Sequence, residues 1–176
     1  LRRSSAASDV YKRQYKYIGI NGHELPVYFL DTDCEENFPD DQIISLRLYS
    51  GDKDHRILQE AILGFGGMKL LDALGQESIQ KYHMNEGHCS FLVLDLLEKY
   101  QGDEKKVKEQ CHFTTHTPVP AGHDHFSYSR VEKLLKGLLP KGLKLPSLVQ
   151  NGVFHMTELG LYFSNSANGV SELHGH

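Results

Sequence analysis

Alternating aromatic and β-branched residues open the patterned part of the chain. Residues 15–20 and 25–30 each have the pattern of a strand, and Asn21-Gly22 stands between them. Asn-Gly favours the tight turns that join antiparallel strands. The pattern therefore predicts a β-hairpin, which an acidic, turn-rich loop over residues 31–41 follows.

Apolar residues then recur at intervals of mostly three and four from Ile57 to Leu74. This spacing predicts a long helix with one apolar face, and Gly75 is well placed to end it. The run Gly64-Phe65-Gly66-Gly67 has some likeness to a phosphate-binding loop, but the helical pattern continues through the glycines. We expect these glycines to permit close packing of the helix instead.

Short strands and helices alternate in the rest of the chain. We expect strands over 79–84 and 111–115, helices over 86–100, 103–110, 129–138 and 154–163, loops over 117–124 and 139–146, and a turn at Asn168-Gly169. This alternation predicts an α/β fold built on a layered sheet.

Composition narrows the class of protein. The chain has 176 residues, of which 39% are hydrophobic, so it can bury a core and is not disordered as a whole. No apolar run is long enough to span a membrane, and a formal net charge of −4 argues against nucleic acid as a partner. Cys34, Cys89 and Cys111 are too few and too scattered for a disulfide scaffold, so we expect a cytoplasmic protein.

Residues 1–14, LRRSSAASDVYKRQ, differ in character from the rest of the chain. They carry four basic residues and one acidic residue, a local charge of 4 − 1 = +3, and they show little apolar periodicity. An Arg- and Ser-rich start is typical of a mitochondrial transit peptide. The segment is also similar to an adapter-derived tail of a translated sequencing fragment, which is the interpretation we favour. We expect a non-native or disordered leader over 1–14 and a partial domain over 15–176.

The first candidate site is the run Asn85-Glu86-Gly87-His88, with His83 just before it. It lies between an expected strand and an expected helix, where Asn85 could cap the helix. Ligands of open α/β sheets bind beyond the carboxyl ends of strands, and helix N-termini favour anionic or hydroxyl-bearing ligands. An ordinary capping turn gives the same pattern, and the spacing alone does not separate the two.

The second candidate site runs from Thr114 to His125 and includes Thr114-Thr115-His116-Thr117-Pro118. Hydroxyls and an imidazole after a strand can bond to a sugar, although a proline-rich turn with surface histidines fits equally well. A metal could use His112 and His116, or His123, Asp124 and His125. We do not expect a metal site, because His112 lies within a strand and few carboxylates surround it.

Several motifs in order resemble one known family. They are Asp52, Arg56, Gln59-Glu60 and the glycines at 64–67; HMNEGH at 83–88; FTTHTPVPAGHDHF at 113–126; HMT at 155–157; and NGVS-x-LHG at 168–175. Together they resemble the α-glucan (glycogen, starch and maltodextrin) phosphorylases, most closely the shorter bacterial and archaeal branch. The resemblance covers residues 15–176 and identifies the chain as a fragment.

The resemblance implies a GT-B-type glycosyltransferase fold of two Rossmann-like halves, with this chain as the later part of the N-terminal half. It implies that the full-length enzyme cleaves terminal α-1,4-linked glucose from a glucan with inorganic phosphate and releases glucose 1-phosphate. The family's cofactor is pyridoxal phosphate, which a lysine in the C-terminal half holds as a Schiff base and which relays a proton through its phosphate. The implied partners are thus an α-1,4-glucan and inorganic phosphate.

The resemblance also assigns roles to residues. His116 matches the histidine that hydrogen-bonds the glucosyl unit, and Asn85, Glu86 and His88 match a motif that borders the same cleft. Asp52 and Arg56 fall where the family has a mobile gate. The family's glycine-rich loop and the C-terminal half are missing, so no complete catalytic set and no cofactor-binding residue is expected here, and the chain alone should be inactive.

Two other classes of function stay open at this stage. One is a non-catalytic carbohydrate-binding domain, against which the absence of tryptophan weighs. The other is a metal-dependent hydrolase that uses the His/Asp cluster after residue 111.

Overall fold

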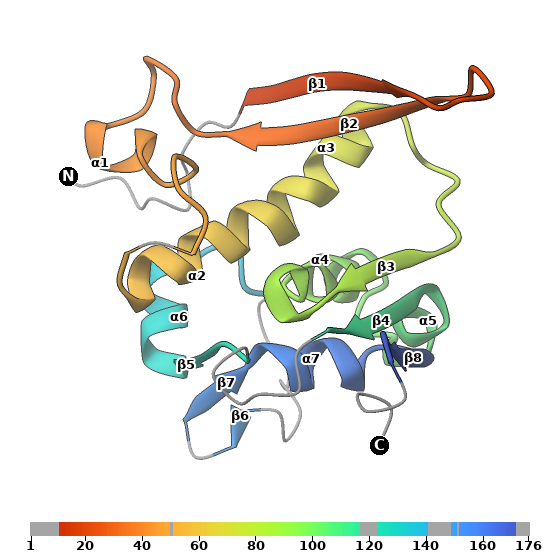
Figure 1. Ribbon diagram of the computed structural model, residues 1–176. Coiled ribbons are helices and arrows are strands. Elements are labelled where there is room, and N and C mark those ends of the chain that lie inside the picture. The colour runs from red at the N-terminus through yellow and green to blue at the C-terminus, as the bar shows by residue number, and fades with distance from the viewer. Residues whose placement is uncertain (1–10, 50, 117–122, 141–148, 151, 172–176) are drawn as a thin grey trace.

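A computed structural model describes residues 11–49, 51–116, 123–140, 149–150 and 152–171 (Figure 1). Most of the two expected loops at 117–124 and 139–146 and residues 1–10 of the expected leader lie outside these ranges. Among the described residues, no helix is long and apolar enough to cross a membrane.

The predicted hairpin is confirmed. Strand β1 (Tyr11–Ile18) pairs antiparallel with β2 (Glu24–Asp31) along its whole length, and Gly22 supplies a positive φ of 76° in the turn. Strand β1 begins at Tyr11, so the end of the expected leader is part of the hairpin. Arg13 Nε lies 2.5 Å from Asp31 Oδ2, so an ion pair joins this part of β1 to β2 in addition to the backbone pairing.

The predicted long helix is also confirmed, in three continuous parts. They are α2 (Lys53–Ala61), the π-helical η2 (Ile62–Gly66) and α3 (Gly67–Ala73), and they lie under the hairpin in Figure 1. Asp52 caps the start through its side chain, and Gly75, with a φ of 67°, follows the end. A short helix α1 (Pro39–Gln42) overlaps the end of the loop expected over 31–41.

Gly64 confirms the expectation of close helix packing. A Cβ at this position would lie 2.8 Å from Cβ of Phe91 and 2.9 Å from the backbone nitrogen of Leu92. Phe65 stacks on Phe91 beside it, with ring centroids 5.7 Å apart. The π-helical segment therefore presses its backbone against the segment that leads into the next helix.

We predict that Gly64→Ala destabilises the chain, because the added methyl meets backbone that cannot move aside. The free energy of unfolding should fall by about 1–3 kcal/mol, as for overpacking of a core. Gly67→Ala is the matched control, because a Cβ there meets nothing within 4 Å and its φ of −58° is helical. The control should gain up to about 1 kcal/mol in urea unfolding, and equal effects of both changes would disprove the packing explanation.

A three-stranded parallel sheet positions the candidate site. Its order is β3 (Tyr82–Asn85), β4 (Cys111–Thr115) and β8 (Ser166–Gly169). The elements between these strands include the 3₁₀ turn η3 (Gly87–Cys89), α4 (Leu92–Lys99), α5 (Glu104–Gln110) and α7 (Met156–Tyr162). The expected turn at Asn168-Gly169 is wrong, because pairing with β4 extends these residues into β8.

A second small sheet lies near the C-terminal part of the chain. β7 (Val153–His155) pairs antiparallel with both β5 (His125–Ser127) and β6 (Val149–Gln150), and α6 (Tyr128–Leu134) follows β5. The helix expected over 154–163 is therefore only partly correct, because its first residues belong to β7. Cross-strand pairing of Phe154 with Phe126, both buried, outweighs their helical spacing.

One apolar core joins the parallel sheet to its helices. Phe91, Leu94, Phe113 and Phe154 are buried within it. A Cβ at Gly160 would lie 2.6 Å from the ring of Phe113, so α7 packs closely on β4. The fold is thus mixed α/β with a parallel sheet, which is compatible with a Rossmann-like domain.

Candidate functional site

The two candidate motifs meet at one edge of the parallel sheet. Asn85 of β3 aligns with Thr114 of β4, and Thr115 of β4 aligns with Gly169 of β8. Because the strands are parallel, their carboxyl ends lie at the same edge, where open α/β sheets bind ligands. The structure thus brings the 83–88 and 113–116 motifs together, as their position after strands suggested.

Glu86 links these two strand ends. Its backbone N–H donates to Thr114 O at 2.9 Å. Its carboxylate Oε1 accepts the backbone N–H of His116 and, at 3.4 Å, the hydroxyl of Thr115. The residue is 5% exposed and has a φ of 66°, which is rare for a residue other than glycine. The exposed His116 therefore leaves the sheet at a point fixed by a buried carboxylate.

Asn85 does not cap a helix, and this expectation is wrong. It is the last residue of β3, and the turn at Glu86 leads into η3 before α4 begins at Leu92. The N-cap positions of η3 and α4 are Glu86 and Phe91, and neither has a side-chain cap hydrogen bond. His88 lies within η3.

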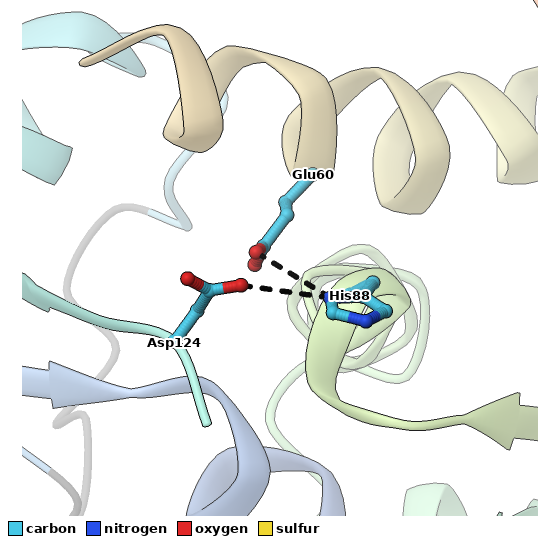
Figure 2. A group of neighbouring side chains, drawn as sticks. All are labelled: Glu60, His88 and Asp124. Atoms are coloured by element: carbon cyan, nitrogen blue, oxygen red, sulfur yellow. Dashed lines mark ion pairs between the residues drawn. The ribbon is translucent and has the colours of Figure 1, made fainter. Parts of the chain in front are cut away.

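A cluster of four charged side chains lies beside this edge. Arg56 and Glu60 come from α2, His88 from η3 and Asp124 from the residues before β5. Figure 2 shows Glu60, His88 and Asp124. Arg56 Nη2 lies 3.0 Å from Glu60 Oε1 and 2.5 Å from Asp124 Oδ2. His88 Nδ1 lies 3.8 Å from Glu60 Oε1 and 3.6 Å from Asp124 Oδ2. The cluster joins three segments that are far apart in the sequence.

Burial and charge shift the pKa values in this cluster. Burial raises the pKa of Glu60 to about 8, because a carboxylate is poorly solvated there. Hydrogen bonds to Asp124 and then to Glu60 raise the pKa of His88 to about 9. Burial opposes the ionisation of Asp124, but hydrogen bonds from His88, Glu60 and Arg56 outweigh it and hold its pKa well below the usual range. His88 is therefore a cation at neutral pH.

We predict that the chain loses stability as the pH rises from about 6.5 to 9. The folded pKa of His88 is above its ordinary value of 6.5, so its stabilising charge is complete below pH 6.5 and is lost as the pH passes about 9. Glu60, whose folded pKa is also raised, acts in the same direction. Urea unfolding across this range should show a loss of about 1–3 kcal/mol.

His88→Gln should reduce this pH dependence and leave only the part due to Glu60, while the surface control His23→Gln in the hairpin turn should retain it in full. A His88→Gln chain with the same slope as the unmodified chain would contradict the assignment.

Polar side chains cover one face of the parallel sheet. His83 Nε2 and Thr114 Oγ1 are 2.6 Å apart, Thr114 Oγ1 donates to Asn168 Oδ1 at 2.8 Å, and His112 bonds to Asn168 and to Ser166. The part played by Ser166 and Asn168 was not predicted from the sequence. The sequence held one signal for it: polar residues stand at every second position of β3, β4 and β8, which places them on one face of the sheet.

The histidines considered as metal ligands do not converge. His112 bonds across the sheet, His123 Nδ1 lies 2.9 Å from Thr157 Oγ1, and His125 stacks on His155. In the described part of the chain, the group of ligand-type side chains that does converge is Glu60, His88 and Asp124. The hydrolase hypothesis loses its proposed ligand set, since only Asp124 of that set belongs to this group.

In the structure, the side chains of Asp52 and Arg56 make local contacts within and beside α2. Asp52 Oδ1 accepts the backbone N–H groups of Asp54 and His55 and so begins α2. The Arg56 side chain, 14% exposed, is held in the charged cluster. Their role as a gate stays a prediction.

A groove of about 1590 Å³ lies between the hairpin, α2–α3 and β3. Its walls are mainly aliphatic and aromatic. The residues that it shares with the candidate motifs and the charged cluster are Arg56, Glu60, His83, Asn85 and His88. Sugar hydroxyls need polar partners, and these residues supply them at this end of the groove.

The described residues do not fit pyridoxal phosphate. A lysine that forms a Schiff base is usually desolvated, whereas no described lysine is buried. Lys69 is 72% exposed, and Lys81 donates to the Glu109 carbonyl away from the strand ends. We therefore derive no chemical step through this cofactor in the chain.

The fold and the site define an α/β protein with a candidate ligand site at the carboxyl ends of parallel strands. No family model matches the chain. It is 39% identical to the maltodextrin phosphorylase of Thermococcus litoralis over 94% of this chain and 21% of that protein. It is 36% identical to the glycogen phosphorylase of Mycobacterium tuberculosis (86% and 20%) and 33% identical to that of Aquifex aeolicus (94% and 27%).

These relatives confirm the resemblance seen in the motifs. Over most of its length, the chain corresponds to a fragment of the bacterial and archaeal glycogen and maltodextrin phosphorylases. It spans about a fifth to a quarter of the length of these relatives.

Proposed function

We propose that this chain is the glucan-binding part of the N-terminal half of an α-glucan phosphorylase. The full-length protein would have a GT-B fold and cleave terminal α-1,4-glucosyl units with inorganic phosphate to give glucose 1-phosphate. The observation that carries this proposal is the junction of two phosphorylase-like motifs through Glu86 and the His116 backbone. The named phosphorylases matched over most of the chain support it.

The residues of this chain would bind and orient the sugar. The exposed imidazole of His116 would hydrogen-bond a glucosyl hydroxyl, and the exposed Asn85 amide would meet a neighbouring hydroxyl. Glu86 would not touch the sugar but would hold the backbone from which the His116 side chain extends. A hydrogen bond that shortens as the sugar ring flattens stabilises the transition state more than the bound substrate.

The remaining chemistry belongs to the rest of the full-length protein in this proposal. Pyridoxal phosphate, which supplies a phosphate group for proton transfer when bound, would be held by a lysine outside this chain. The proposed compartment is the cytoplasm, with which the three free cysteines agree.

The chain expressed alone should release no glucose 1-phosphate from maltoheptaose and inorganic phosphate. It should also show no absorbance of bound pyridoxal phosphate, because no described lysine is suited to hold it. A phosphorolysis assay with a spectrum of the purified chain tests both points. Turnover by the isolated chain would overturn the assignment as a fragment of the site.

A further inference from the structure

A nitrogen of Arg56 lies between three potential metal ligands. Ligand atoms of Glu60, His88 and Asp124 all lie within 4.8 Å of one another, and Figure 2 shows their side chains pointing toward a common centre. Arg56 Nη2 lies 3.0 Å from Glu60 Oε1, 3.4 Å from His88 Nδ1 and 2.5 Å from Asp124 Oδ2. The guanidinium thus occupies the position where a metal ion would sit.

The distances between the ligand atoms are close to those of a metal site. His88 Nδ1 lies 3.8 Å from Glu60 Oε1 and 3.6 Å from Asp124 Oδ2. Ligands at zinc distances in a tetrahedral site are separated by about 3.4 Å. The three residues would therefore need to move little to bind a metal ion.

Glu60 places a buried carboxyl group against the Arg56 cation. Its side chain is 1% exposed, and its buried Oε2 has no hydrogen-bond partner among the described residues. Burial raises the pKa of this carboxyl group, whereas the neighbouring guanidinium, which can bond to several acceptors at once, favours its ionised form. The ring of Tyr49, 5.1 Å from Arg56 Cζ, adds a cation–π contact to the same guanidinium.

We propose that Glu60, His88 and Asp124 form a three-ligand cation site in which Arg56 takes the place of a metal ion. The Arg56 guanidinium, on α2, holds η3 through His88 and the segment before β5 through Asp124. Arg56 is therefore a positioning residue, since it acts through its partners. Two of those partners adjoin the candidate site: His88 lies two residues after Glu86, and Asp124 lies on the segment that follows His116.

Arg56→Ala tests the cation site directly, because it removes the guanidinium and keeps the three ligands. By calorimetry at pH 8, the variant should bind one Zn²⁺ per chain, whereas the unmodified chain should not bind Zn²⁺ at this site. The double variant Arg56→Ala/His88→Ala is the control and should bind Zn²⁺ at least about tenfold more weakly. Zn²⁺ should also raise the urea midpoint of Arg56→Ala but not that of the control. A folded Arg56→Ala chain that binds Zn²⁺ no better than the control would overturn the proposal.

A second pair of variants tests the charge without a metal. Arg56→Lys keeps a cation, while Arg56→Gln keeps a hydrogen-bonding side chain without charge. The urea midpoint of Arg56→Lys should lie nearer to that of the unmodified chain, with Arg56→Gln lower by on the order of 1 M. Equal midpoints, or a higher one for Arg56→Gln, would overturn the proposal. If Arg56→Ala folds only with Zn²⁺, the proposal is supported; if it does not fold even then, the Lys and Gln variants decide.

Neither experiment involves a glucan or phosphate. The cation site can therefore stand if the proposed phosphorylase function fails, and it can fail while that function stands.

Discussion

Replacement of His116 by alanine in an active phosphorylase that carries this chain should lower kcat/KM by roughly 30- to 1,000-fold, or about 2–4 kcal/mol. His116 leaves β4 at the carboxyl edge of the sheet, and Glu86 fixes its backbone. Loss of a hydrogen bond that tightens in the transition state should reduce kcat as well as kcat/KM. Steady-state phosphorolysis of maltoheptaose measures the effect, and the content of pyridoxal phosphate should not change.

His123→Ala and His125→Ala are the matched controls for this prediction. The His123 side chain bonds to Thr157, and the His125 ring stacks on His155. Both side chains thus contact residues outside the parallel strands β3, β4 and β8. Each change should cost roughly tenfold or less in kcat/KM. An effect of His123→Ala as large as that of His116→Ala, with loss of a stoichiometric metal, would favour the hydrolase hypothesis instead.

Glu86→Ala should have the next largest effect, a loss of roughly 5- to 150-fold in kcat/KM. The change leaves the backbone N–H of His116 without its carboxylate partner, which costs about 1–3 kcal/mol. Glu86→Ala should reduce kcat as well as kcat/KM, as His116→Ala does, because Glu86 acts through His116.

A double-mutant cycle between Glu86 and His116 measures this coupling. The two alanine changes together should cost clearly less than the sum of the two separate losses. Glu86→Gln, which keeps an oxygen able to accept the N–H, should retain most of the activity. Full additivity of the two alanine changes would show that Glu86 acts independently of His116.

The sequence predicted best the elements whose stability is local. The hairpin around Asn21-Gly22 and the long helix that ends before Gly75 both carry strong local signals, and both are present. The packing role of Gly64 was also predictable, because a helical pattern ran through it.

Long-range pairing explains where the predicted and observed elements differ. Asn168-Gly169 has the local signal of a turn, but its pairing with Thr114 and Thr115 makes it a strand. Phe154 has helical spacing, but its pairing with Phe126 places it in a sheet.

The candidate site was predictable only in part, because some of its contacts depend on long-range pairing. His116, Glu86 and His88 stood in recognisable motifs after strands, so their residues could be named from sequence. The backbone hydrogen bond of His116 to Glu86 depends on the register of β3 with β4, which no local pattern contains. Glu60 was named only within the motifs that resemble the family. Its contacts with His88 and Asp124 could not be predicted, because these partners are distant in sequence.

The most direct test of the central claim is an exchange of segments. The matched part of the Thermococcus litoralis maltodextrin phosphorylase would be replaced by this chain, and release of glucose 1-phosphate from maltoheptaose would be measured with and without inorganic phosphate. Release of glucose 1-phosphate should require inorganic phosphate, and His116→Ala should strongly reduce it. A folded hybrid that retains pyridoxal phosphate but releases no glucose 1-phosphate would contradict the central claim.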